Sequence, residues 1–161
     1  SSWVDQATLL ARVSRPIDTP HNMTPGRLAF EAGLGQGIAW AIQIANWALV
    51  AVIVFVAMFR CSPVASYLAV VVATQLVSPI LWDHYAMVLL IPVAWLLSRG
   101  HRWAGAIPLA TSIIFVGAIP PIAYPLAYWV TLLAVVREGW VRSPRTLPAQ
   151  ASTETGAILR S

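Results

Sequence analysis

Long apolar runs separated by short polar turns dominate the chain. Residues 38–59 form a nearly unbroken apolar stretch, long enough as a helix to cross a hydrocarbon core of about 30 Å. Shorter apolar stretches follow, divided by prolines or by clusters of polar residues. We therefore expect an all-α, polytopic integral membrane helical bundle over residues 38–136. Its spans, about five in number, are expected at residues 38–59, 64–81, 85–97, 103–119 and 122–136.

The two flanking segments have a different character. Residues 1–37 mix charged residues with Pro16, Pro20 and Pro25, which prevent one continuous helix and predict a loop with short interfacial helices. Residues 137–161 are polar and contain several arginines, so they bury too little apolar surface to fold alone. We expect a disordered basic tail there.

Composition and charge favour a membrane environment. Hydrophobic residues make up 58% of the chain and charged residues only 10%, against about 25% charged in ordinary soluble domains. All ten cationic residues are arginines, and they lie at predicted helix ends and in the tail rather than on one soluble face. Anionic membrane lipids are therefore the expected counter-charge, and nucleic acid is not an expected partner.

The arginines also predict an orientation, because cytoplasmic loops are enriched in positive charge. With five spans, only Arg27 lies close to a span on the arginine-poor side. We expect a multi-pass protein of the cell membrane, with its N-terminal segment and residues 78–85 extracytoplasmic and its C-terminal tail cytoplasmic. The arginines on the opposite, cytoplasmic side are Arg60, Arg99, Arg102, Arg137, Arg142 and Arg145.

The stretch with the most chemical potential is residues 78–85, SPILWDHY. A carboxylate and an imidazole stand side by side at the end of a broken apolar helix, where both are costly unless they reach water or a partner. His84 is suited to donate a hydrogen bond to a phosphate, and Asp83 to orient it or to bind sugar hydroxyls. The alternative is an interfacial anchor, with Trp82 and Tyr85 in the aromatic belt and the polar pair facing water.

A second polar stretch, residues 21–25, precedes a short amphipathic segment that carries Arg27 and Glu31. Asn22 is a candidate binding residue, although asparagine and threonine before a helix commonly serve only as caps. Arg27 either meets an anionic phosphate at the outer interface or is a solvated loop charge. His21, Asp83 and His84 give too few ligands for a metal, and no motif for a cofactor is present.

Together the two stretches resemble the C-terminal part of bacterial polyprenyl-phosphate-mannose-dependent α-mannosyltransferases of glycosyltransferase family 87, which are of the GT-C type. Members of that family often carry an Asn-x-Ser/Thr element and later a Ser-Pro-x-x-Trp-x-His-His/Tyr element before a span. Here these correspond to Asn22-Met23-Thr24 and to residues 78–85. The resemblance covers roughly residues 20–100.

The resemblance implies a membrane hexosyltransferase that moves a sugar, mannose, from a polyprenyl phosphate to a glycolipid or glycan acceptor on the extracytoplasmic face. It implies that His84 and Asp83 are catalytic and stabilise the donor phosphate as negative charge develops. The acidic residue that activates the acceptor in this family has no counterpart here, so we expect an incomplete chain that needs its N-terminal half. The remaining substrate-binding residues implied are Asn22, Trp82, Tyr85 and Arg27.

A different class of function is also open. The broken helices are compatible with a non-catalytic module of a transporter or of an assembly complex, in which they line a path. The predicted span interiors contain no ionisable group, only polar residues such as Gln43, Asn46, Thr74 and Gln75. Because ion pathways usually need ionisable groups near the midplane, this pattern favours the enzyme.

Overall fold

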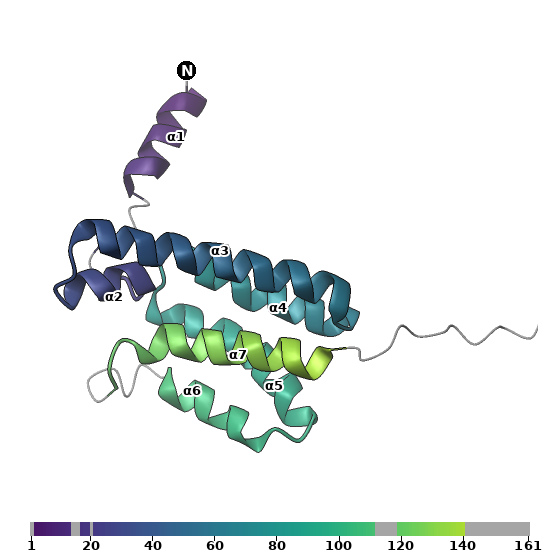
Figure 1. Cartoon of the computed structure of the whole chain (residues 1–161). Coiled ribbons are helices and arrows are strands. Elements are labelled where there is room, and N and C mark those ends of the chain that lie inside the picture. The colour runs from purple at the N-terminus through teal and green to yellow at the C-terminus, as the bar shows by residue number, and fades with distance from the viewer. Residues whose placement is uncertain (1, 14–16, 20, 112–118, 141–161) are drawn as a thin grey trace, which may run out of the picture.

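The computed structural model describes residues 2–13, 17–19, 21–111 and 119–140 (Figure 1). Within these ranges the chain forms only helices and turns, with no strand, which confirms the all-α expectation. The α-helices are α1 Ser2–Val13, α2 Pro25–Glu31, α3 Gln36–Arg60, α4 Pro63–Val77, α5 Leu90–Ser98, α6 Ala106–Ala110 and α7 Ala123–Gly139. Two 3₁₀ helices, η1 Asp83–Leu89 and η2 Arg102–Gly105, lead into α5 and α6.

A tight turn joins α3 to α4 and makes them antiparallel neighbours (Figure 1). Arg60 ends α3, where a cation is favoured by the helix dipole. Ser62 then caps α4, with its hydroxyl accepting a hydrogen bond from the amide of Ala65 at 3.4 Å, and Pro63 occupies the first turn. The residues of this turn thus bring two apolar helices together.

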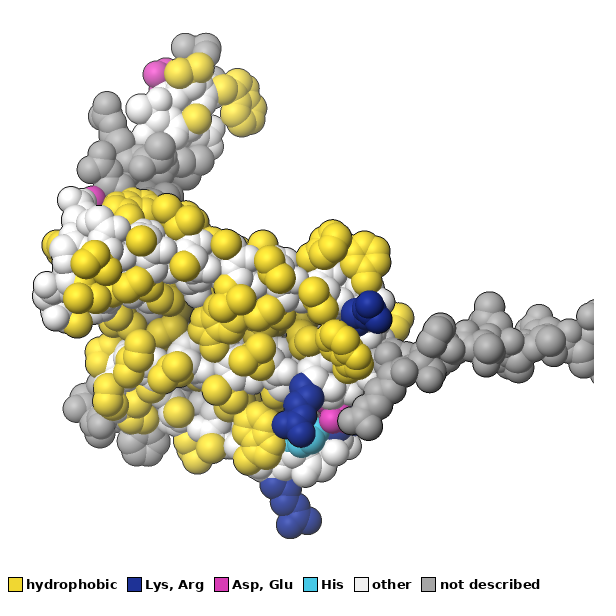
Figure 2. Space-filling model, in the orientation of Figure 1, with side chains coloured by type: hydrophobic (Ala, Val, Ile, Leu, Met, Phe, Trp, Pro, Cys, Tyr) yellow, Lys and Arg dark blue, Asp and Glu magenta, His cyan; other side chains and the backbone are white. Residues whose placement is uncertain are grey.

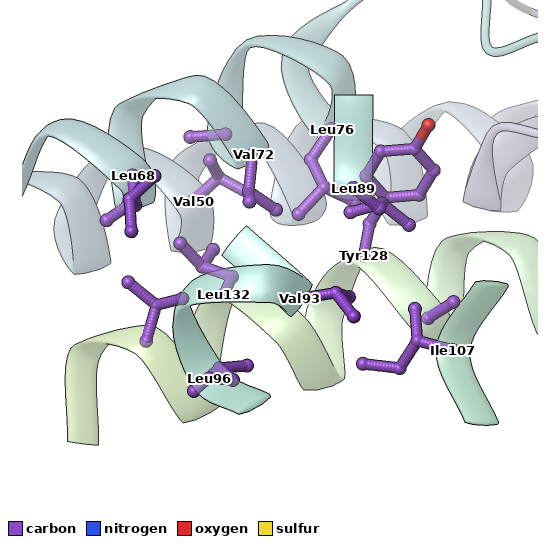
Figure 3. Close-up of a cluster of buried hydrophobic side chains, with 14 of the residues drawn as sticks. Val50, Leu68, Val72, Leu76, Leu89, Val93, Leu96, Ile107, Tyr128 and Leu132 are labelled. Atoms are coloured by element: carbon purple, nitrogen blue, oxygen red, sulfur yellow. The ribbon is translucent and has the colours of Figure 1, made fainter. Parts of the chain in front are cut away.

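Helix α4 lies between α3 and α7 and forms the centre of the bundle (Figure 3). One face of α4 is almost wholly buried, and α7 packs so closely on it that a Cβ on Gly139 would lie 2.0 Å from Cβ of Ala65. The amide of Ser62 donates to the carbonyl of Gly139 at 2.9 Å and fixes the same end. The core side chains drawn in Figure 3 include Val50, Leu68, Val72, Leu76, Leu89, Val93, Leu96, Tyr128 and Leu132.

The expectation of about five spans is wrong for the described residues, among which only α3 is long and apolar enough to cross a membrane. Prolines and polar turns divide the other apolar stretches into shorter helices. The stretch 64–81 becomes α4, which has 15 residues and stops before Ser78 and Pro79. The stretch 85–97 is shared by η1 and α5, and 122–136 falls in the 17-residue α7.

The predicted span 103–119 differs most from the structure. It begins with η2 and the five-residue α6, and residues 112–118 lie outside the described part of the chain. Most of the predicted tail, residues 141–161, is also outside it, so the disorder expected there stays a prediction. The expected loop 1–37 contains α1 and α2 as its two described helices.

On the face seen in Figure 2 the arginine side chains gather at one end of the bundle, which we call the arginine pole. Glu138 stands among these cations, with Oε2 at 2.9 Å from Nε2 of His101 and Oε1 at 4.0 Å from a nitrogen of Arg99. Because α3 and α4 are antiparallel, residues 22–35 and 78–85 lie at the other end, the motif pole. The arginine pole comprises Arg60, Arg99, Arg102 and Arg137, which end α3, α5 and α7 or begin η2.

Candidate functional site

The two sequence motifs meet at the motif pole, although 57 residues separate Asn22 from Pro79. Nδ2 of Asn22 donates a hydrogen bond to the carbonyl oxygen of Pro79 at 2.9 Å, and Oδ1 accepts one from the amide of Leu81 at 2.8 Å. The amide of Met23 donates to the carbonyl of Leu81 at 2.9 Å. Three hydrogen bonds therefore fix the start of one motif against the middle of the other.

The local sequence explains why the backbone of both segments is available for these hydrogen bonds. Pro79 has no N–H to continue α4, and the Ser78 hydroxyl donates to the carbonyl of Ile80 at 2.7 Å, which stabilises an open turn. On the other side, Oδ1 of Asn22 also accepts from the amide of Thr24 at 3.2 Å. This asparagine turn leads directly into α2 at Pro25.

His84 is held in a cluster of three rings that follows the turn. Its imidazole centroid lies 5.3 Å from the ring of Trp82 and 4.6 Å from the ring of Tyr85. Tyr85 also packs against the apolar core, whereas Trp82 is 40% exposed and His84 is exposed. The site therefore exposes an imidazole and an indole at the surface, next to the Tyr85 ring, which is anchored in the core.

The structure places the remaining predicted residues differently. Nε of Arg27 donates to Oε1 of Glu31 at 2.8 Å, and NH1 donates to the carbonyl of Ile17 at 2.6 Å. In the described part of the chain these contacts, and the ring of Phe30 at 5.9 Å, hold the guanidinium on α2 rather than against the ring cluster. Asp83 begins η1, and its side chain lies outside the described structure.

An apolar groove, which we call the lateral groove, lies beside the motif pole, where α2 and α3 face α7 and the residues that lead into α7. It consists of two cavities of about 610 Å³ and 300 Å³ that share Pro25, Ile42 and Ile122. Pro25 lies three residues after Asn22, so the groove begins next to the clamped turn. Its further walls are Leu28, Ala29, Glu31, Ala32, Ala45, Asn46, Leu49, Pro120, Pro121, Pro125, Leu126 and Trp129.

Sequence reasoning missed two residues that support this pole. Oε1 of Gln43 accepts a hydrogen bond from the amide of Gly26 at 3.0 Å, and a Cβ on that glycine would lie 2.8 Å from the carbonyl oxygen of Ala39. Gly26 is therefore what allows α2 to lie directly on α3. The sequence signal for Gln43 is only that a polar residue stands inside an apolar run. That pattern does not predict which group its side-chain amide binds.

Three comparisons, with protein-family models, with curated proteins and with solved structures, give no significant match for this chain. The resemblance to glycosyltransferase family 87 therefore depends on the two short motifs alone and stays a prediction. Among the described residues, no group of three or more His, Cys, Asp and Glu side chains is arranged to hold a metal ion.

Proposed function

We propose that this chain is the C-terminal portion of a membrane glycosyltransferase that transfers a sugar, mannose, from a polyprenyl phosphate to a glycolipid or glycan acceptor on the extracytoplasmic face. The observation that carries the proposal is the clamp between the two motifs. Asn22 and the turn at residues 79–81 are distant in sequence but hydrogen-bonded to each other. The clamp lies at the pole opposite the arginines, as a donor site outside the cell requires.

The surface of the bundle supports a multi-pass arrangement around α3, the one described helix that meets the length requirement. Large apolar side chains cover the flank of the bundle over several helices (Figure 2), and an extended apolar surface of this kind commonly marks a contact with a membrane or another protein. The shorter helices then pack against α3 with their outer faces in lipid. Examples of such exposed residues are Ile44, Leu49, Phe55, Tyr67, Leu90, Ile91, Leu126 and Leu133.

In the proposed reaction, the bond between the anomeric carbon of the sugar and the phosphate oxygen breaks, and the electron pair leaves with the polyprenyl phosphate. An acceptor hydroxyl forms the new bond to that carbon and loses its proton to a base, which we assign to no residue of this chain. A hydrogen bond from the His84 imidazole to the leaving phosphate stabilises the developing charge. The lateral groove offers the hydrocarbon chain of the donor an apolar wall next to the site.

The proposal is tested by donor binding to the full chain in lipid nanodiscs. Polyprenyl-phosphate-mannose is titrated against the wild type, against His84→Ala and against His101→Ala, a matched histidine at the arginine pole. Loss of a hydrogen bond to a charged phosphate costs about 1.5–3 kcal/mol, so His84→Ala should weaken binding by roughly 10- to 100-fold. His101→Ala should bind as the wild type does.

Two results would count against a transferase. Equal affinity for polyprenol without the phosphate would mean that the site recognises only the chain. Equal affinity of the His84→Ala variant would mean that the imidazole does not touch the phosphate. Solute flux through the protein in proteoliposomes, without donor binding, would favour the transporter module instead.

A further inference from the structure

We infer that Asn22 is a positioning residue, which fixes the place of the His84 imidazole without touching the substrate itself. The inference gains its catalytic meaning from the proposed function, but its structural content can be measured alone. Asn22 is only 2% exposed, and both ends of its amide are engaged with backbone groups of residues 79 and 81. Asn22 therefore acts through residues 79–81, whose backbone it holds in place.

The path from Asn22 to the imidazole is short. Leu81 is 1% exposed and receives the clamp on both its amide and its carbonyl, so its backbone cannot rotate freely. Trp82 comes next and accepts a hydrogen bond from the amide of Tyr85 at 3.1 Å, which starts the turn of η1. His84 therefore lies only three residues after Leu81, whose backbone is fixed, and in the first turn of η1.

The amide of asparagine is specifically suited to this clamp because it donates and accepts at once. Aspartate keeps the acceptor for the amides of Leu81 and Thr24 but sets a second oxygen against the carbonyl of Pro79. Leucine has the same number of side-chain heavy atoms with the same branching and makes none of these bonds. The two substitutions thus separate loss of all the side-chain bonds of Asn22 from loss of the single bond to Pro79, while the backbone bond from Met23 to Leu81 can remain in both.

The experiment uses the full chain in nanodiscs, with ¹³C label on the histidine Cε1 positions. The rings of Trp82 and Tyr85 should shift the His84 resonance away from that of a histidine without neighbouring rings, so its position reports the ring cluster. His101 lies 6.2 Å from the ring of Trp103 at the arginine pole and serves as the internal reference. The variants are Asn22→Leu, Asn22→Asp and Asn46→Leu, the last removing a buried asparagine that clamps helices instead.

The positioning role predicts that Asn22→Leu loses most of the ring-induced shift of His84 and leaves the His101 signal in place. Asn22→Asp should lose a smaller part, and Asn46→Leu should retain the His84 shift even though it lowers stability. An unchanged His84 shift in Asn22→Leu overturns the inference, as does an equal loss in Asn46→Leu. If Asn22→Leu does not fold, an unchanged shift in a folded Asn22→Asp overturns it as well.

Donor titration separates this inference from the proposed function. If the wild type does not bind polyprenyl-phosphate-mannose but Asn22→Leu still loses the His84 shift, the sugar-transfer proposal fails and the positioning role stands. If the wild type binds the donor and Asn22→Leu keeps both the shift and the affinity, the positioning role fails alone. A fall in affinity of Asn22→Leu similar to that of His84→Ala supports both.

Discussion

The indole Nε1 of Trp129 donates a hydrogen bond of 3.0 Å to Oδ1 of Asn46, and this contact joins α7 to α3 across the floor of the lateral groove. Nδ2 of the same asparagine donates to the carbonyl of Leu76 at 2.8 Å. One buried side chain therefore links α3, α4 and α7. A polar residue with both ends satisfied inside an apolar bundle sets the relative position of the helices that it joins.

Asn46→Leu should lower the free energy of unfolding by about 1–3 kcal/mol, because the Trp129 indole and a Leu76 carbonyl lose their partner. Thr74→Val is the control, since its exposed hydroxyl donates to the carbonyl of Val71 and accepts from the side chain of Gln75, both within α4. Unfolding of both variants is followed by helical circular dichroism in mixed micelles. A stability equal to that of the wild type would show that the link between the three helices contributes little.

Gly139→Ala should be strongly destabilising, because the new Cβ would lie 2.0 Å from that of Ala65 and the two helices must separate. Overpacking of this kind costs about 1–3 kcal/mol. Gly37→Ala is the matched control, since no atom lies within 4 Å of a Cβ there and alanine is the better helix former. Unfolding of both variants at the same temperature would contradict the close packing of α7 on α4.

Tyr128→Phe should leave stability unchanged or raise it. The Tyr128 hydroxyl is buried with no hydrogen-bond partner in the described structure, so its removal relieves a desolvation cost. Tyr124→Phe is the comparison, since that hydroxyl donates to the carbonyl of Thr111 at 3.0 Å and its loss should cost about 1 kcal/mol. Tyr124→Phe should therefore melt at a clearly lower temperature than Tyr128→Phe. A large loss of stability in Tyr128→Phe would reveal a hydrogen-bond partner for its hydroxyl.

Thiol labelling in intact cells tests the orientation of the bundle. Burial raises the pKa of the Cys61 thiol, which also donates to the carbonyl of Val136 at 3.4 Å, so the native cysteine should react slowly. In a Cys61→Ala background, an impermeant maleimide should label His84→Cys from outside and leave Arg102→Cys unlabelled until the membrane is opened. The reverse pattern would place the motif pole in the cytosol and remove the basis for extracytoplasmic sugar transfer.

The main elements could be predicted from the sequence where a single local signal decides them. The run 38–59 predicts α3 to within a few residues, whereas the span expected at 64–81 runs past the end of α4 at Val77, because Pro79 cannot continue the helix. Helix lengths were overestimated because hydropathy measures apolar character and not continuity of the backbone. Residues 85–97 are apolar throughout, yet they divide into a 3₁₀ helix and a short α-helix.

The site could be predicted only in part. Residues 82–85 stand out in the sequence because their polar and aromatic side chains lie in one short stretch, and the function expected of them stays a prediction. The clamp of Asn22 on Pro79 was not predicted, because a hydrogen bond between distant residues depends on how α3 and α4 fold back on each other. The lateral groove has no sequence signature either, since it depends on how α2, α3 and the start of α7 are spaced in the fold.

The clamp also has a consequence for biogenesis. Asn22 leaves the ribosome before its partner Pro79, which follows 57 residues later, after the whole of α3 and α4 has been synthesised. The Asn22 amide therefore cannot make its bonds to residues 79 and 81 until α3 and α4 have folded back on each other. Completion of that hairpin is the event that assembles this pole.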